Sequence, residues 1–493
     1  MSPRQPKLAS GQSAEGGDIA RSAVTVRRAG PPVASIERQG IEYISPGARW
    51  GRPASLFGLW AGAVANVEYL LYGCLAVLLF GLSFGQAVAI ICVGNLSYLL
   101  TGLASLQGPQ AGTTTFTVSR APFGPRGNKV PTLFNWATQV GFEVEGLSLI
   151  VFAGLALAAR GGLGATGSVK IIAVLAAVAI QAVLPVLGHA AVLKVLRVLA
   201  VPFAVLFVIM AVITVPKAHL TAGHGAGWGA MTVFLALVIA GGGLGWTENA
   251  NDYSRYLPAG TSPRRIVAAV ALGAAIPSAL LEILGAAVAT GVPGASSVTG
   301  LTAGFPGWFI VPYLTVAIIQ LFAINTLDLY SSGVTLQSLI PGLSRLQCVT
   351  IDTVVAGGLT AAAVFSSRFF ALLSDFVLFI IVWLGPWCAI YLTDWLLRRG
   401  RYDPAALLDV RGGRYFRRGG VHWPAIIAQA AGMAAAMLWL NAATPYVSVL
   451  SRSAGLSDFS VFTGFAVGGI VYWLLARRAV RAEGAATGSP DDR

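Results

Sequence analysis

The stretch Ala236–Leu257 reads ALVIAGGGLGWTENANDYSRYL, an apolar run that meets four glycines among the five residues Gly241–Gly245 and then turns polar. Glycine weakens a helix interior, so this cluster predicts an interruption just before Trp246. Inside a membrane, unwound backbone is tolerated only where it lines a cavity or is covered by protein. The stretch therefore predicts a broken membrane helix beside a solute site.

A second apolar stretch, Trp60–Gly73, reads WAGAVANVEYLLYG and carries small residues with polar Asn66 and Glu68 near its middle. In the helix count below, this stretch belongs to the first helix, and the glycine-rich stretch before Trp246 belongs to the sixth. Paired breaks at corresponding positions in two halves are typical of secondary transporters built from inverted repeats. The glycines could instead serve only close helix packing, but the matched pair favours a site.

The composition points to a membrane protein, because 56% of the 493 residues are hydrophobic and only 11% are charged. Apolar runs of at least about 18 residues, long enough to cross a bilayer as helices, recur along the chain. We expect an all-α polytopic membrane protein with twelve transmembrane helices. Their expected ranges are 55–81, 84–106, 130–158, 169–188, 191–215, 230–253, 264–291, 308–337, 347–366, 369–397, 422–442 and 459–476.

The distribution of basic residues supports this count. If the N-terminus is cytoplasmic, 28 of the 33 lysines and arginines fall in cytoplasmic segments, as the positive-inside rule requires. We therefore expect an inner or plasma membrane protein with both termini in the cytoplasm. The expected divisions are a disordered tail at 1–50, a transporter core at 51–398 with repeats at about 55–215 and 230–397, a basic loop at 399–421, helices 11 and 12 within 422–476, and a C-terminal tail at 477–493.

Other classes of protein fit the sequence poorly. The net charge of +13 lies in the predicted loops, so it reports topology and predicts no nucleic-acid partner. The four cysteines have no CxxC spacing, and the four histidines fall at helix ends or in loops. No nucleophile, zinc or nucleotide motif is present, so we expect no enzyme activity, no metal and no cofactor.

Six carboxyl groups lie in the predicted membrane interior with no lysine or arginine at similar depth. Such groups are costly in hydrocarbon and usually mark function. Burial without a cation favours the neutral acid, which could carry a coupling proton, bind a cationic solute or serve only a structural role. The six are Glu68, Glu143, Glu145, Glu248, Glu282 and Asp328. Our candidates for proton coupling are Glu68, Glu145, Glu248 and Asp328.

Helical spacing selects candidates for the solute site. On the third helix Gln139, Phe142, Glu145 and Gly146 share a face, and on the eighth Asn325 and Asp328 begin a polar stripe with Ser331 and Ser332. Flat heterocycles stack on aromatic faces while polar groups read their edges. The expected solute-binding residues are Trp246, Phe142, Glu145, Gly146, Asn325, Asp328 and Asn66.

Five motifs in order give the chain a family resemblance. They are IERQGIEYISPGARWGRPASLFGLWAGAVANV from residue 36, GPQAGTTTFTVSRAPFGPRGN from 108, GWTENANDYSRYLP from 245, LYSSGVTLQ from 329 and PWCAIYLTDWLLRRGRYD from 386. Across roughly residues 36–410 the chain resembles the nucleobase–cation symporter family, in its purine–cytosine permease branch of cytosine, purine, allantoin, thiamine and vitamin B6 transporters.

The resemblance implies a LeuT-type fold, a 5+5 inverted repeat plus two helices. It implies that Trp246 and Phe142 stack on the base, although Trp is commoner at the second position. Gly146 replaces a polar contact that Glu145 could supply, and Asp328 replaces the Asn that reads the base edge. These departures make the pocket more acidic than the family's pattern.

The same resemblance bears on the coupling ion. Sodium-coupled relatives carry hydroxyl ligands at two positions that here hold Phe322 and Ala323. Neither side chain can ligate a hard cation, so the resemblance implies proton coupling.

We therefore expect a secondary active transporter that imports a nucleobase or related small heterocycle by proton symport and alternating access. The alternatives are a proton-coupled carrier of a cationic or vitamin-like ring, such as thiamine or pyridoxine, or of allantoin or a hydantoin. A sodium-coupled carrier and a non-transporting receptor fit less well. The exact substrate and the oligomeric state stay open.

Overall fold

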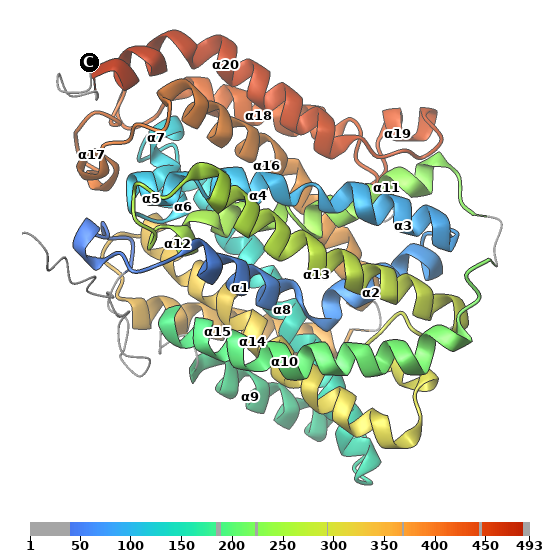
Figure 1. Cartoon of the computed structure of the whole chain (residues 1–493). Helices are drawn as coiled ribbons and strands as arrows, with labels where there is room; N and C mark the ends of the chain where they lie inside the picture. The colour runs from blue at the N-terminus through green and yellow to red at the C-terminus, as the bar shows by residue number, and fades with distance from the viewer. Residues whose placement is uncertain are drawn as a thin grey trace, which may run out of the picture.

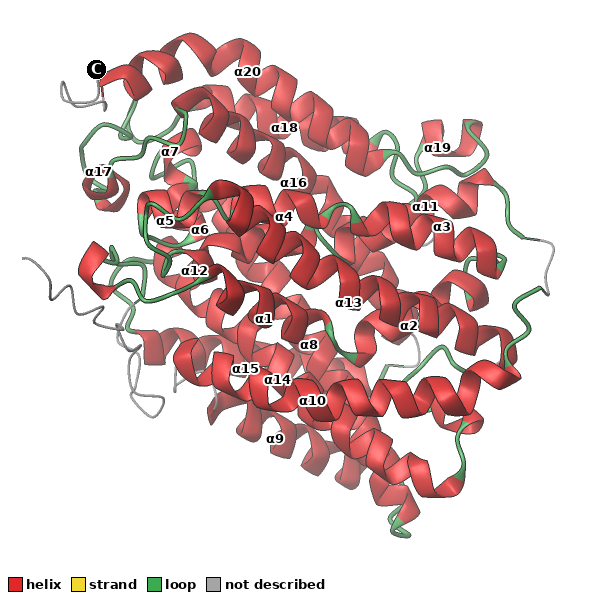
Figure 2. Ribbon diagram, in the orientation of Figure 1, coloured by secondary structure: helices red, strands yellow, loops and turns green. Residues whose placement is uncertain are grey.

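The computed structural model describes residues 40–183, 189–221, 225–292, 294–366, 369–442 and 446–486. Within these ranges the chain is helical, with no strand longer than an isolated bridge (Figure 2). An all-helical chain satisfies its backbone hydrogen bonds within each segment, which is what hydrocarbon demands. The all-α prediction is confirmed.

The helices of the first half follow in chain order as η1 (Pro46–Ala48), α1 (Pro53–Val64), α2 (Val67–Leu78), α3 (Phe84–Asn95), α4 (Tyr98–Ala104), α5 (Gln107–Ala111), α6 (Thr115–Val118), α7 (Arg120–Phe123), α8 (Lys129–Arg160), α9 (Gly167–Val183), α10 (His189–Thr214) and η3 (Val215–Lys217). Those of the second half are α11 (Trp228–Gly241), η4 (Gly245–Asn249), α12 (Ala250–Ser254), α13 (Pro263–Gly291), η5 (Gly300–Gly304), α14 (Gly307–Leu339), α15 (Arg345–Val364), α16 (Phe369–Arg398), α17 (Pro404–Leu408), α18 (Trp423–Met437), α19 (Val449–Ser453) and α20 (Ser460–Ala486).

By length and composition, the described helices supply fewer full membrane spans than the twelve expected. Among the described residues, nine helices are long and apolar enough to cross a membrane. The pair α1 and α2, bent by 53° at its break, would be a tenth. Two further apolar helices, α9 and α18, are shorter than a full span. The count of twelve is therefore not confirmed.

The predicted tails differ in part from the structure. Residues 1–39 lie outside the described residues, but residues 40–50 pack on the core rather than extending away. The amide of Ile44 donates to the Gly112 carbonyl at 2.8 Å, and the buried Arg49 donates to the Pro109 carbonyl at 2.5 Å. These bonds order the segment. At the other end, α20 continues through Ala486, into the range predicted as a tail.

Two groups of long helices lie on opposite sides of the molecule, and a further long helix, α13, packs on α1 and α2. Helix α14 runs along α8 through the middle of the molecule, with α9, α10 and α15 beside them (Figure 1). Helices α16, α18 and α20 pack on one another at the opposite side. Helices α18 and α20 thus cover α16 at the edge of the bundle.

Helices α2 and α13 touch backbone to backbone. A Cβ atom built on Gly73 would lie 1.8 Å from the Glu282 carbonyl oxygen, and one on Gly285 would lie 1.9 Å from the Leu70 carbonyl oxygen. Small residues let membrane helices approach this closely, and the gain in packing holds them together. The two glycines therefore fix the distance between the first broken span and α13.

We expect Gly285→Ala to lower the free energy of unfolding by about 1–3 kcal/mol, because the added methyl group must push the two helices apart. Gly154→Ala on α8 is the matched control, since a Cβ there meets no atom within 4 Å. That control should be neutral or gain up to about 1 kcal/mol from helix propensity. Unfolding of the purified proteins in detergent measures both. Equal stability of Gly285→Ala and the parent would contradict the close contact.

Candidate functional site

The glycine-rich stretch forms the predicted break between α11 and η4. The freed backbone groups of this break are bonded by the segment around α4. The Thr101 hydroxyl donates to the Gly243 carbonyl at 2.6 Å, and the Gly243 amide donates to the Ser97 hydroxyl at 3.1 Å. A Cβ on Gly243 would lie only 2.1 Å from the Ser97 backbone. Glycine is therefore required here by a close backbone approach.

The break between α1 and α2 is held by two amide side chains. The Asn66 side chain accepts a hydrogen bond from the Glu68 amide at 2.8 Å and donates to the Ala63 carbonyl at 2.9 Å. It is thus the N-cap of α2. From α14, the Gln320 side chain donates to the Ala65 carbonyl at the break itself. Sequence analysis missed Gln320, although a lone amide in the apolar run VAIIQLF was a signal.

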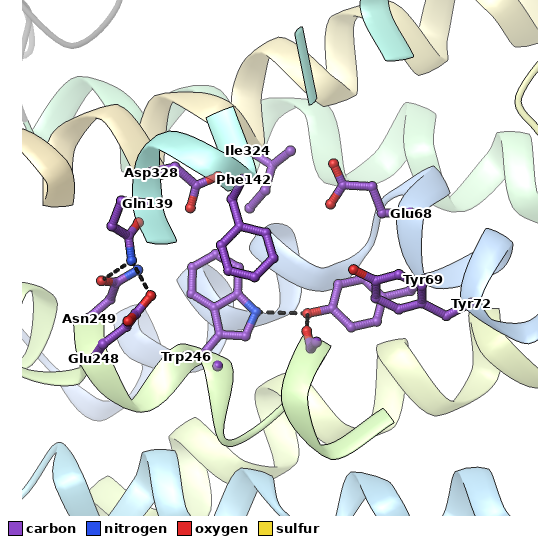
Figure 3. Close-up of a pocket in the computed structure, with 12 residues that line it drawn as sticks. Glu68, Tyr69, Tyr72, Gln139, Phe142, Trp246, Glu248, Asn249, Ile324 and Asp328 are labelled. Atoms are coloured by element: carbon purple, nitrogen blue, oxygen red, sulfur yellow. Dashed lines mark hydrogen bonds between the residues drawn. The ribbon is translucent and has the colours of Figure 1, made fainter. Parts of the chain in front are cut away.

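A small cavity lies beside these two breaks and α8 and α14 (Figure 3). Its volume is about 30 Å³, well below the roughly 300–1,000 Å³ of typical ligand pockets. The walls would have to move apart to admit a ring. The lining residues are Glu68, Tyr69, Tyr72, Gln139, Phe142, Gly241, Gly245, Trp246, Glu248, Asn249, Ile324 and Asp328.

The cavity wall combines aromatic rings with acids. Trp246 and Phe142 enter from the second broken helix and from α8, and the two tyrosines enter from α2. Trp60 and Trp246 form a T-shaped pair, with ring centroids 5.4 Å apart and an interplanar angle of 83°. An aromatic pair at this distance and angle is favourable and limits the motion of the indole.

Three carboxyl groups line the cavity, and none of its lining residues is basic. Glu248 accepts a hydrogen bond from the Gln139 amide group, which also donates to the Asn249 side chain at 3.0 Å. The other two, Glu68 and Asp328, lie on opposite sides of Phe142 in Figure 3. Such a wall can donate or accept hydrogen bonds at the edge of a ring, or balance a positive charge.

The structure brings some of the expected site residues together and leaves others aside. Trp246, Phe142 and Asp328 line the cavity, as do the coupling candidates Glu68 and Glu248. Those that do not line it are Asn66, Glu145, Gly146 and Asn325.

Gly146 and Asn325 meet where α8 crosses α14. A Cβ on Gly146 would lie 2.2 Å from the Asn325 side-chain oxygen, and Asn325 donates to the Glu143 carbonyl at 3.1 Å. Glycine on α8 thus makes room for an amide that ties the two helices. Glu145 is buried nearby on α8, and its Oε2 atom has no hydrogen-bond partner within the part of the chain that the structure describes.

A second polar cluster joins α8, α14 and α15. The Ser332 hydroxyl oxygen lies 2.8 Å from the Glu143 Oε1 atom and 2.9 Å from the Asp352 Oδ2 atom. The Oδ1 atom of Asp352 accepts a hydrogen bond from the Trp136 indole nitrogen at 2.5 Å. Sequence analysis did not single out Asp352, although it is a carboxylate inside an apolar helix. This cluster does not line the cavity.

Glu282 forms a third polar contact, between α3 and α13. It accepts from the Asn95 side chain at 2.6 Å, and Ser278 donates to that amide at 2.5 Å. Apart from Glu145, the six carboxyls predicted in the membrane interior therefore divide into those that line the cavity and those that tie helices together.

Comparison with known proteins identifies the family that the sequence motifs resemble. The model of a family described as permeases for cytosine/purines, uracil, thiamine and allantoin matches residues 43–464. The putative purine-cytosine permease YxlA of Bacillus subtilis is 30% identical over 453 residues, which cover 90% of this chain and 96% of that protein. The purine-cytosine permease fcyB of Emericella nidulans is 30% identical over 178 residues, 33% of this chain and 35% of that one.

Among solved structures, the chain is similar to Mhp1, a nucleobase-cation-symport-1 family transporter, in a closed conformation with bromovinylhydantoin bound. The TM-score is 0.73 at 19% identity, over 94% of this chain and 99% of that one. The inward-facing conformation of Mhp1 matches with a TM-score of 0.67, over 92% and 96%. This likeness concerns the fold, and it confirms the LeuT-type architecture that the resemblance implied.

Proposed function

The chain belongs to the family of permeases for cytosine/purines, uracil, thiamine and allantoin, and we propose that it imports a nucleobase or a related small heterocycle by proton symport. Members of this family are multi-pass membrane transporters rather than enzymes. In the proposal, alternating access exposes the cavity beside the two helix breaks to each side in turn. Both termini are proposed to lie in the cytoplasm, with the basic loop at 399–421 on the same side.

The proposal for the solute rests on the residues that line the cavity. Aromatic faces from Trp246 and Phe142 suit a flat ring, and Asp328 and Gln139 supply polar groups for its edge. The small volume of the cavity requires the solute to separate its walls, so binding and conformational change would be linked.

Three observations favour a proton over sodium. Phe322 and Ala323 stand where sodium-coupled relatives are expected to carry hydroxyls, and both are buried. The Ala65 carbonyl at the first break, an oxygen of the kind that binds sodium, accepts a hydrogen bond from Gln320. Glu68 and Glu248 line the cavity and can carry the proton.

Uptake by proteoliposomes tests the coupling. We expect accumulation of radiolabelled cytosine or adenine to require an inward proton gradient and to collapse with a protonophore at constant sodium. Replacing sodium by potassium should leave the initial rate unchanged. Strict dependence on external sodium with no response to a pH gradient would contradict proton symport.

Replacement of the stacking residue tests the solute site. We expect Trp246→Ala to weaken binding of a nucleobase by about 1–3 kcal/mol, the usual value for the loss of one aromatic platform. Trp308→Ala is a matched control, because this tryptophan is exposed at the start of α14, away from the cavity. Binding measured by calorimetry should be unchanged in the control. Unchanged affinity in Trp246→Ala would remove Trp246 from the site.

A second candidate solute is a positively charged ring such as thiamine. Its support is the set of three carboxyl groups around the cavity, with no basic residue among the lining residues. Aromatic walls also stabilise cations, through the negative faces of their rings. When these acids are ionised, a wall of this kind would favour a cation over a neutral base.

Asp328→Asn separates the two candidates, because it keeps the shape of the side chain and removes its charge. If the natural solute is a cation held by the carboxylate, affinity for it should fall at least tenfold, as expected for a charge-assisted hydrogen bond of roughly 1.5–3 kcal/mol. Affinity for neutral nucleobases should stay constant or rise. Uptake measured between about pH 5 and pH 8 with both solutes gives the comparison, and wild-type kinetics for the cation would rule out the cationic candidate.

A further inference from the structure

The hydroxyl group of Tyr69 uses its complete hydrogen-bonding capacity. It accepts from the Trp246 indole nitrogen at 2.7 Å and from the Tyr98 hydroxyl at 2.9 Å, and it donates to the Gly241 carbonyl at 3.2 Å. A phenolic hydroxyl has one proton and two lone pairs, so nothing remains to bond a solute. Figure 3 shows the two contacts made with the second broken helix.

The three partners come from separate elements. Gly241 is the last residue of α11, so its carbonyl has no helical partner where the helix stops. Trp246 lies in η4, just beyond the break, and Tyr98 begins α4. Tyr69 itself lies on α2, just after the other break. One oxygen atom therefore joins both broken helices and α4.

The geometry also limits the indole of Trp246 from two directions. Its nitrogen is bonded to Tyr69, and Trp60 packs against its ring from the side. Tyr69 is buried, with 2% of its surface exposed, so its hydroxyl shields the indole N–H from bulk water. The rotamer of the indole thus depends on the Tyr69 hydroxyl.

We propose that Tyr69 is a positioning residue for solute binding, whose hydroxyl holds the Trp246 ring in the orientation that stacks on the solute. The proposal rests on the proposed function, in which Trp246 is the stacking platform. Because the hydroxyl has no free donor or acceptor, Tyr69 reads no polar edge of the solute. It acts on affinity through Trp246 and contributes nothing to the choice between bases.

This role gives a distinctive kinetic signature. In Tyr69→Phe, we expect the KM for uptake to rise about five- to tenfold while the maximal rate stays within about twofold. The factor should be the same for cytosine and adenine, which differ in edge pattern but both stack. In a Trp246→Phe background, which has no indole donor, Tyr69→Phe should raise the KM by clearly less. Tyr313→Phe, which removes a buried hydroxyl bonded to the Val298 carbonyl away from the cavity, should leave the KM unchanged.

A second measurement does not depend on transport. In protein labelled with ¹⁵N-tryptophan, the indole cross-peak of Trp246 is identified by its loss in Trp246→Phe. We expect its proton to exchange slowly with D₂O in the wild-type protein and quickly in Tyr69→Phe. If wild-type protein imports no nucleobase, the proposed function fails while the exchange experiment still tests whether Tyr69 holds the indole.

Three outcomes would overturn the proposal. One is rapid exchange of the Trp246 indole proton in the wild-type protein, which remains measurable even if Tyr69→Phe does not fold. Another is an unchanged KM in Tyr69→Phe. The third is a Tyr69→Phe variant that changes the ranking of cytosine and adenine, since this would mean that Tyr69 contacts the solute edge directly.

Discussion

A broken helix in hydrocarbon leaves backbone N–H and C=O groups that must find partners within the protein, because lipid offers none. The structure meets this requirement at both breaks with side chains from other helices. Thr101, Ser97 and Tyr69 bond the groups freed around Gly241 and Gly243, and Gln320 bonds the Ala65 carbonyl. The cavity can exist between the breaks because these bonds are made.

The same partners also position the side chains that line the cavity proposed as the solute site. Since Tyr69 bonds both the Gly241 carbonyl and the Trp246 indole, the backbone of the break and its aromatic ring are held by one atom. Gln139 similarly holds Glu248, which follows Trp246 on the same short helix. Two faces of the site, one aromatic and one acidic, are thus positioned by side chains from α2 and α8.

Three other buried acids, Glu143, Asp352 and Glu282, tie helices together and do not line the cavity. Glu143 and Asp352 share the Ser332 hydroxyl where α8, α14 and α15 meet, and Glu282 is bonded to Asn95 between α3 and α13. Polar groups of this kind strengthen contacts between membrane helices, where apolar side chains gain little from leaving lipid. Burial of a carboxyl alone therefore does not distinguish a solute site from a helix contact in this protein.

The sequence alone determined the helical membrane class, the two breaks, the family and the acidic, aromatic character of the proposed site, because each depends on composition or on local patterns. Helical periodicity also placed Phe142 and Asp328 on inward faces. It could not separate Asp328, which lines the cavity, from Asn325, which shares its stripe but packs on Gly146. Nor could it identify the partners of Tyr69 and Gln320, since these partners lie 172 and 255 residues away along the chain. Only the tertiary structure decided which polar groups face the cavity and which tie helices together, because that depends on how α8 and α14 cross and on the backbone groups that each break leaves to be bonded.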